Sequence, residues 1–238
     1  MDEAFPWDPL QYPFEVPSGS FRWIAGTVAP LSSSVPVDEL TTQRHAVLAI
    51  GSNASPAQLT RKFSDRRFMD PASSNGCIPV LTAVADEVDV VYGAHLAWYG
   101  ALPATLLETP GACAHVFVTW LTSVQLERMN ETEGLGHSYQ LRRITGVRSH
   151  GGEVDAAMSY VTVAGVSVLS GSPLGLASIH ATGSSWPRGT QRQAWDRLSA
   201  DMGCGMNGKI LLDRVLDSPI WRERVESHLA SNRLAETH

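Results

Sequence analysis

The turn at residues 51–53 is the first stretch whose residue types and spacing could do chemistry. It follows the apolar run 47–50, which is typical of a buried strand. Ser55, Pro56 and Gln58 then form a helix start with a serine cap, a proline at the first helical position and a capping-box glutamine. Backbone N–H groups at such a strand-to-helix turn suit a carboxylate or a phosphate. A purely structural turn is the other interpretation.

A carboxylate about eighty residues further on is the second chemical candidate. Glu133 lies just past a predicted helix, and if the last turn persists through it, Glu133 shares one face with Leu126 and Met129, at positions i, i+3 and i+7. Burial among apolar groups disfavours the charged form of a carboxylate, which suits a general acid or base near neutral pH. Gly134 then stops the helix, and Tyr139 can donate a hydrogen bond at the same mouth. The alternative is a helix-end glutamate in solvent.

The elements expected to position these groups alternate between strands and helices. Thr122 and Gln125 form a capping box for the helix that carries Glu133. We predict further strands at residues 78–84, 88–91, 95–99, 114–121, 139–147 and 156–169, and a short one that ends at the turn Pro110-Gly111. We predict helices at residues 56–63, 123–132, 191–202, 210–215 and 220–232.

Three segments follow from changes in composition along the chain. Residues 1–45 are rich in proline and aromatic residues, and we expect an extended arm with an added strand near residues 21–28. Residues 46–183 form the expected main domain, which carries both chemical candidates, and residues 184–238 form a helical extension packed on it. The arm could also dock on a neighbouring subunit, so a homo-oligomer is a possible assembly. Arg61, Lys62, Arg66 and Arg67 form a mildly basic patch, which we interpret as solvated surface, the alternative being a contact to an acidic substrate group.

Composition excludes several classes of protein. The 238 residues are 43% hydrophobic and 18% charged, with a net charge of −6 and no run of basic residues, so nucleic acid and membrane surfaces are poor partners. The three cysteines are far apart and show neither a disulfide framework nor zinc spacing, which favours the reducing cytoplasm. The sequence starts Met1-Asp2-Glu3, without a basic and then apolar run, so we expect no signal peptide.

Three stretches in order resemble the γ-glutamyl cyclotransferase family. Residues 48–53 look like its YGSN loop. Residues 104–111 and 116–120 resemble its strand, Pro-Gly turn and strand, and residues 126–134 with Tyr139 are similar to its helix that ends in Glu-Gly. The matched region, roughly residues 46–165, is a little over half of the chain.

The resemblance implies an α/β (α+β) fold, a mixed β-barrel with flanking helices. It implies a small-molecule γ-glutamyl or related acyl-amino-acid substrate, held by Ile50, Gly51, Ser52, Asn53 and Tyr139. Glu133 would move a proton from the substrate's α-ammonium to the leaving amine. The α-amine attacks the γ-carbonyl, which gives 5-oxoproline and a free amine without metal or cofactor. Ring closure needs mainly positioning, a proton carrier and donors for the oxyanion.

Departures from the family pattern keep other functions open. Ile50 stands where YGSN has its tyrosine, so a contact beside the substrate is lost or reshaped. The alternatives are a related amide hydrolase or acyl transferase on a larger conjugate, and a non-catalytic small-molecule binding or interaction protein. A nucleophilic Ser52 is a further possibility, although the turn lacks G-x-S-x-G spacing. No histidine pair has zinc-ligand spacing, and His137, four residues from Glu133, is the histidine closest to the predicted site.

Overall fold

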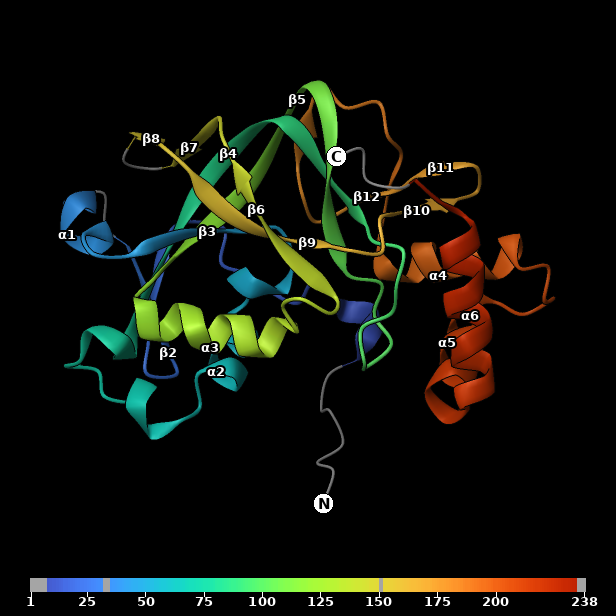
Figure 1. Ribbon diagram of the computed structural model, residues 1–238, viewed down its shortest axis with the longest axis horizontal. Coiled ribbons are helices and arrows are strands. Elements are labelled where there is room, and N and C mark those ends of the chain that lie inside the picture. The colour runs from blue at the N-terminus through green and yellow to red at the C-terminus, as the bar shows by residue number, and fades with distance from the viewer. Residues whose placement is uncertain (1–7, 32–34, 150–151, 235–238) are drawn as a thin grey trace.

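A strongly twisted sheet dominates the protein. The computed structural model describes residues 8–31, 35–149 and 152–234. Within these residues the sheet has 12 strands, with the central order β14-β12-β4-β5-β3-β9-β6. Its two longest strands, β4 (Cys77–Tyr92) and β5 (Ala104–Leu121), pair antiparallel and form the arch at the top of Figure 1.

The remaining strands extend this arch on both sides. On one side lie β3 (His45–Ala49), β9 (Ala157–Thr162) and β6 (Tyr139–Ile144), and the β3–β9 pair is parallel. On the other side and at the edges lie β7 (Val147–Ser149), β8 (Gly152–Val154), β12 (Gly175–Leu176), β13 (Ala181–Thr182) and β14 (Arg188–Gly189). A separate small sheet contains β10 (Val166–Leu169), β11 (Ser172–Pro173) and β15 (Arg233–Leu234).

The mixed α and β composition is as predicted, but the expected closed barrel is not formed. The hydrogen-bonded order of the described strands ends at β14 on one side and β6 on the other, so the sheet is unclosed. The prediction of separate short strands was also wrong for β4 and β5. Glu87, with φ of 62°, marks a bulge that faces residues 109–112, so the predicted Pro110-Gly111 turn is an irregularity inside one strand.

The N-terminal segment packs along its own chain. Its added strand is a hairpin of β1 (Phe21–Ile24) and β2 (Thr27–Pro30), and β1 pairs antiparallel with β4. Phe21 and Trp23 are fully buried, and the Trp23 indole N–H donates to Thr60 Oγ1 at 2.9 Å. A short helix, α1 (Val37–Thr41), links this hairpin to β3.

Two helices follow the strands that carry the predicted chemistry. α2 (Pro56–Lys62) starts with Pro56 as predicted, but the predicted Ser55–Gln58 capping box is absent, because the Ser55 hydroxyl makes no cap bond and Gln58 accepts instead from Arg61. α3 (Ser123–Glu133) confirms its prediction, with both bonds of the Thr122–Gln125 capping box formed. Short 3-10 turns lie at Pro9–Gln11, Ser52–Ala54, Arg66–Phe68 and Ser74–Gly76.

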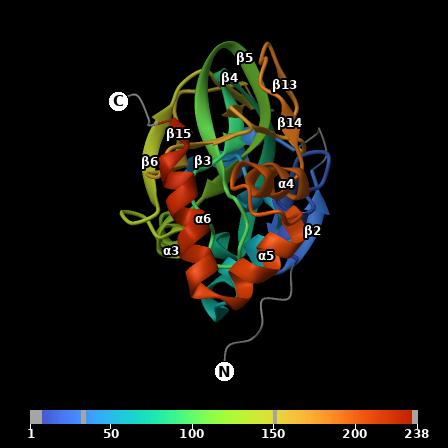
Figure 2. The same cartoon turned by 90° about the vertical axis from the view of Figure 1, so that its right-hand side faces the viewer.

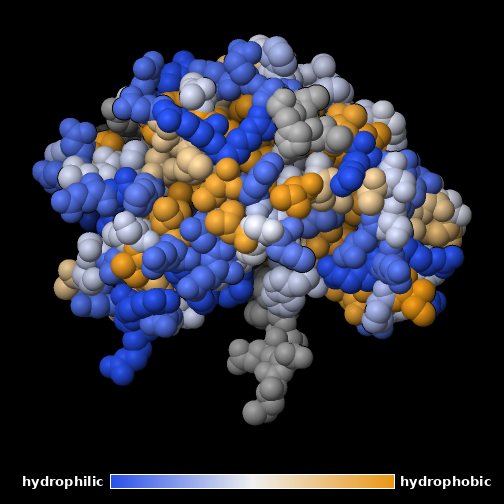
Figure 3. All heavy atoms as spheres, in the orientation of Figure 1, coloured by the Kyte–Doolittle hydropathy of each residue, from blue (hydrophilic) through white to orange (hydrophobic). Residues whose placement is uncertain are grey.

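Three C-terminal helices cover one end of the sheet. α4 (Gln191–Asp201), α5 (Gly208–Asp217) and α6 (Pro219–Ser231) confirm the predicted helical region and stand together on the side that faces the viewer in Figure 2. Their buried residues Trp195, Leu211 and Val225 join the same apolar cluster as the inner face of the arch. In Figure 3 hydrophilic side chains make up most of the face shown, with apolar patches across its middle. Within the described part of the chain, no helix has the length and apolar character needed to span a membrane.

Candidate active site

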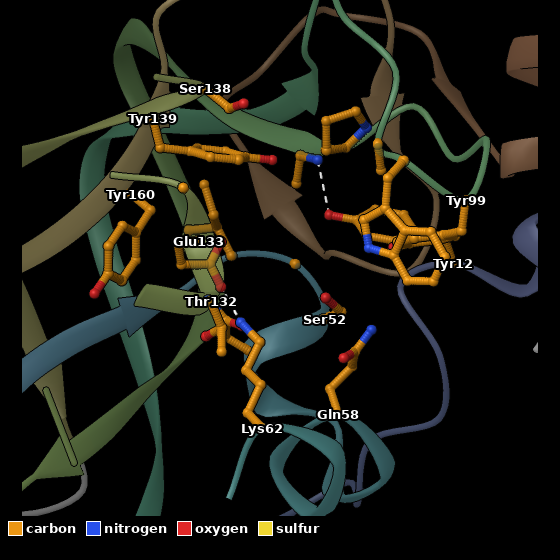
Figure 4. Close-up of a pocket in the computed structure, with 18 of the residues that line it drawn as sticks. Tyr12, Ser52, Gln58, Lys62, Tyr99, Thr132, Glu133, Ser138, Tyr139 and Tyr160 are labelled. Carbon is orange, nitrogen blue, oxygen red and sulfur yellow. Dashed lines mark hydrogen bonds and ion pairs between the residues drawn. The ribbon is translucent and has the colours of Figure 1, made fainter. Parts of the chain in front are cut away.

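A cavity of about 380 Å³ lies where the β3–α2 turn faces the end of α3. All six residues singled out from the sequence line it, namely Ile50, Gly51, Ser52, Asn53, Glu133 and Tyr139. Further walls come from Tyr12 of the N-terminal segment, from Lys62 at the end of α2, and from the loop 95–103 between β4 and β5. Figure 4 shows Tyr12, Ser52, Lys62, Glu133 and Tyr139 around one space. Segments far apart in sequence therefore build a single polar cavity.

The turn after β3 forms one wall of the cavity. Ile50 is buried, with its side chain in the apolar core, and the chain then enters a 3-10 turn over Ser52–Ala54. The Ser55 N–H donates to the Ser52 carbonyl at 2.9 Å, which fixes the turn. The predicted strand, turn and helix are confirmed here, although the strand ends one residue earlier, at Ala49.

Glu133 forms an ion pair with Lys62 at the centre of the cavity. Glu133 ends α3, and Gly134 with φ of 65° turns the chain away. The two side chains are 12% and 4% exposed, and the Lys62 ammonium donates both to the carboxylate and, at 2.7 Å, to Asn53 Oδ1. Burial lowers the pKa of Lys62, while the Glu133 carboxylate opposes that shift. One ammonium therefore joins the turn to the carboxylate.

This pair corrects two expectations from the sequence. Lys62 is buried instead of belonging to a solvated basic surface, because the last turn of α2 points it beneath α3. Glu133 is inward-facing as predicted, but its neighbour is a cation as well as the apolar groups expected there. The ion pair holds the Glu133 carboxylate in one position at the cavity wall.

Tyr12 is a site residue that the sequence did not indicate. It is 7% exposed, and its hydroxyl oxygen accepts the Ala104 N–H at 2.8 Å. A Cβ atom added at Gly51 would lie 2.2 Å from that oxygen, so only glycine allows the phenol to approach the turn this closely. An aromatic side chain thus enters the cavity from the N-terminal segment.

Replacing Gly51 by alanine is expected to expel Tyr12 from the cavity. The new methyl group would overlap the phenol oxygen and also lie 3.2 Å from the Ala104 Cβ, so the tyrosine must move and lose its bond to Ala104. We expect a loss of stability of about 1–3 kcal/mol, typical of overpacking. Chemical denaturation measures it, and the matched exchange Gly19→Ala, where a Cβ would meet nothing, should have a much smaller effect. Equal stability of both variants would show that Tyr12 does not sit against Gly51.

A histidine also lies at the cavity wall, but not the one expected. His137 is exposed and outside the cavity, whereas His95 packs edge-to-face on Tyr139 with ring centroids 5.4 Å apart. Its Nδ1 lies 2.9 Å from Thr162 Oγ1, and burial lowers the pKa of His95 to about 4. His95 is therefore neutral at pH 7. It hydrogen-bonds to Thr162 and not to Ser52, which gives no support to a serine nucleophile.

His95 should make stability depend on pH below neutrality. Its ordinary pKa is 6.5, so between pH 6.5 and about 4 the unfolded chain binds the proton and the folded chain does not. Stability is thus fully present above pH 6.5 and falls on acidification, by an amount on the order of 3 kcal/mol. Urea denaturation at pH 7 and pH 5 measures it, with His95→Gln as comparison. If the wild type loses no more unfolding free energy between pH 7 and pH 5 than His95→Gln does, His95 is not the group responsible.

The loop 95–103 forms an aromatic rim on the cavity. Trp98 is 63% exposed and packs edge-to-face on Tyr99, with centroids 5.4 Å apart. Arg222 of α6 holds the loop by donating to the carbonyls of Leu96, Ala97 and Trp98. The prediction of a strand over residues 95–99 was therefore wrong, because these carbonyls bond to a side chain and not to a neighbouring strand.

Among the described residues, no three histidine, cysteine or carboxylate side chains gather closely enough to hold a metal ion. The polar groups that line the cavity include the Lys62–Glu133 ion pair, the Asn53 amide and the Tyr12 phenol.

Comparison with known proteins finds similarity at the level of solved structures. No protein-family model matches the sequence, and no curated protein matches it. One similar structure is a γ-glutamyl cyclotransferase, 12% identical over 77% of this chain and 99% of that chain, with a TM-score of 0.39. YkqA from Bacillus subtilis is 12% identical over 91% of this chain and 72% of its own, with a TM-score of 0.41. An uncharacterized human protein is 13% identical over 82% of this chain and 92% of its own, with a TM-score of 0.40.

Proposed function

We propose that this protein is a γ-glutamyl cyclotransferase-like enzyme that converts a γ-glutamyl amide into 5-oxoproline and an amine. The observation that carries the proposal is the Glu133 carboxylate, 12% exposed, which lines the same cavity of about 380 Å³ as residues 51–53. The volume fits one small acyl-amino acid, and the order of turn, helix and carboxylate along the chain is the one that the resemblance predicts.

The substrate's charges set its orientation in the cavity. Its α-carboxylate would accept hydrogen bonds from the N–H groups of the turn at Ser52 and Asn53, which the 3-10 conformation directs to one side. The α-ammonium would then lie against Glu133. This arrangement brings the α-nitrogen near the γ-carbonyl carbon, and closing a five-membered ring within one bound molecule has a high effective molarity.

The reaction follows as an intramolecular aminolysis. Glu133 takes a proton from the α-ammonium, the freed amine forms a bond to the γ-carbon, and the carbonyl oxygen becomes an oxyanion. The bond from the γ-carbon to the amide nitrogen then breaks as Glu133 returns its proton to that nitrogen. The second proton of the attacking nitrogen also passes to the leaving amine, so 5-oxoproline and an ammonium product result. The side chain of Ser52 has no covalent role in this scheme.

Lys62 would position Glu133 for the proton transfer. Its ammonium bonds to both Glu133 and Asn53, so it holds the carboxylate against the turn that would bind the substrate. A carboxylate held in this way keeps one position for taking up the proton and for returning it to the leaving amine.

Removing this ammonium should slow the reaction. In Lys62→Met the Glu133 carboxylate loses the donor that holds it beside Asn53, so we expect kcat/KM to fall by up to about 10²-fold through misplacement of the carboxylate. Steady-state kinetics measure the fall, and Lys209→Met, which removes a lysine from a half-exposed pair with Asp213, is the control. An unchanged kcat/KM in Lys62→Met would remove Lys62 from the mechanism.

The proposed reaction is tested directly by its products. A panel of γ-glutamyl amino acids and γ-glutamyl amines is incubated with the full chain, and 5-oxoproline, free glutamate and free amine are quantified. The proposal expects 5-oxoproline and amine in equal amounts. Release of free glutamate would instead identify a hydrolase. No product from any member of the panel would favour the binding-protein alternative.

A further inference from the structure

The Tyr12 hydroxyl accepts a backbone hydrogen bond at the cavity wall. Tyr12 follows the 3-10 turn Pro9–Gln11, and its oxygen accepts the Ala104 N–H at 2.8 Å. A phenol has two acceptor positions and one proton. The Ala104 N–H occupies one acceptor position, and the proton remains for a partner elsewhere.

The Tyr12 proton is directed toward the cavity. In Figure 4 the Tyr12 hydroxyl points from the aromatic rim toward the side that holds Glu133 and Tyr139, above Ser52. Among the described residues, no protein group accepts the Tyr12 proton. The other cavity tyrosine with an assigned donor bond differs, because the Tyr160 hydroxyl donates to Asn130 at 2.5 Å. Tyr12 is therefore a donor aimed at whatever occupies the space above residues 51–53.

We propose that the Tyr12 hydroxyl donates a hydrogen bond to the γ-carbonyl oxygen of the substrate as it becomes an oxyanion, which makes Tyr12 a catalytic residue. This inference rests on the proposed cyclotransferase function. The Ala104 N–H that donates to the phenol oxygen withdraws electron density from it and strengthens the phenol O–H as a donor. Burial also raises the pKa of Tyr12, so the donor stays protonated at neutral pH.

The role of Tyr12 also explains how an aliphatic residue can stand at position 50. An aliphatic residue at position 50 packs into the apolar core, and the phenol reaches the turn from a residue 38 positions earlier in the sequence. The contact of Gly51 with Tyr12 keeps the donor beside the turn that would hold the substrate. The N-terminal segment is then part of the active site and not only a cover for the sheet.

Removing the Tyr12 hydroxyl tests the role. Tyr12→Phe keeps the ring and should lower kcat by about 10²–10³-fold, as for the loss of one oxyanion donor, with KM changed by less than about 3-fold. Tyr92→Phe is the matched control, because it deletes another buried phenol hydroxyl of the same apolar cluster, one that donates to the Gly189 carbonyl outside the cavity. Tyr12→Phe with kcat equal to that of the control would overturn the inference.

Ring fluorination at position 12 separates the donor role from a structural one. Fluorotyrosines in place of Tyr12 keep the packing, make the phenol a stronger donor and make its oxygen a weaker acceptor from Ala104. A donor to the oxyanion predicts that kcat rises with phenol acidity, whereas a purely structural acceptor predicts no rise, which would overturn the inference. Absence of 5-oxoproline from the wild type would overturn the proposed function itself. An active wild type with unaffected Tyr12 variants would overturn only the role of Tyr12.

Discussion

Replacing Glu133 by glutamine should lower kcat by about 10²–10⁴-fold, the usual contribution of a positioned general acid and base. The amide cannot take a proton from the α-ammonium, so the attacking amine is not generated. The amide oxygen can still accept a hydrogen bond from Lys62, which keeps the side chain in place. We expect the substrate to bind while turnover is lost, and single-turnover formation of 5-oxoproline measures the effect.

Glu127→Gln supplies the matched control for this substitution. It removes the same charge from the same helix, but its side chain is exposed and does not line the cavity. Its kcat should equal that of the wild type. If Glu133→Gln retains more than about a tenth of the wild-type kcat, the proton is carried by another group. Measuring Tm for both variants separates this result from unfolding.

The sequence predicted the parts of the candidate site that lie in local motifs. The turn at residues 51–53 and Glu133 could be found because a strand, a helix start and a helix end each have signals within a few residues. The Thr122–Gln125 box was predicted correctly for the same reason. At Ser55 the same signal failed, because the buried hydroxyl makes no cap bond and the Gln58 side chain accepts a hydrogen bond from Arg61 instead.

Lys62 and Tyr12 could not be predicted because their positions depend on tertiary packing. Lys62 sits among basic residues and resembles solvated surface, and only the placement of α3 over α2 makes it a buried partner of Glu133. Tyr12 lies in a segment without periodicity, and its role depends on a bond to Ala104, 92 positions away. A glycine at position 51 was the one local sign that a side chain approaches there.

The architecture of the sheet was predicted less well than its composition. Turn-forming residues led us to predict that strands end near residues 85–87 and at Pro110-Gly111. In the structure β4 and β5 continue across these positions, with a bulge between them. The backbone groups on either side of the bulge are satisfied by pairing between the two strands, so no turn is needed there. Whether a sheet closes depends on register and twist across all strands, and local residue patterns do not contain that information.

The segment between β12 and α4 is fastened to the sheet by a buried ion pair. Asp89 of β4 is fully buried, and Arg188 donates to its two carboxylate oxygens at 2.9 and 3.0 Å. The Arg188 Nε also donates to the carbonyls of Leu176 and Ile179, while Ser184 Oγ donates to Asp89 at 2.6 Å. One guanidinium therefore joins β4, β12 and the loop that leads to the C-terminal helices.

We expect Arg188→Met to destabilise the fold by about 3–5 kcal/mol, because it leaves the Asp89 carboxylate buried without its cation. Urea denaturation at pH 7 measures the change. The double variant Arg188→Met with Asp89→Leu should recover most of the loss, since a well-packed apolar pair carries no unpaired charge. Lys209→Met, which breaks the half-exposed pair with Asp213, should cost no more than about 1 kcal/mol. If the double variant were no more stable than Arg188→Met, the loss would come from the carbonyl contacts of the guanidinium and not from the buried charge.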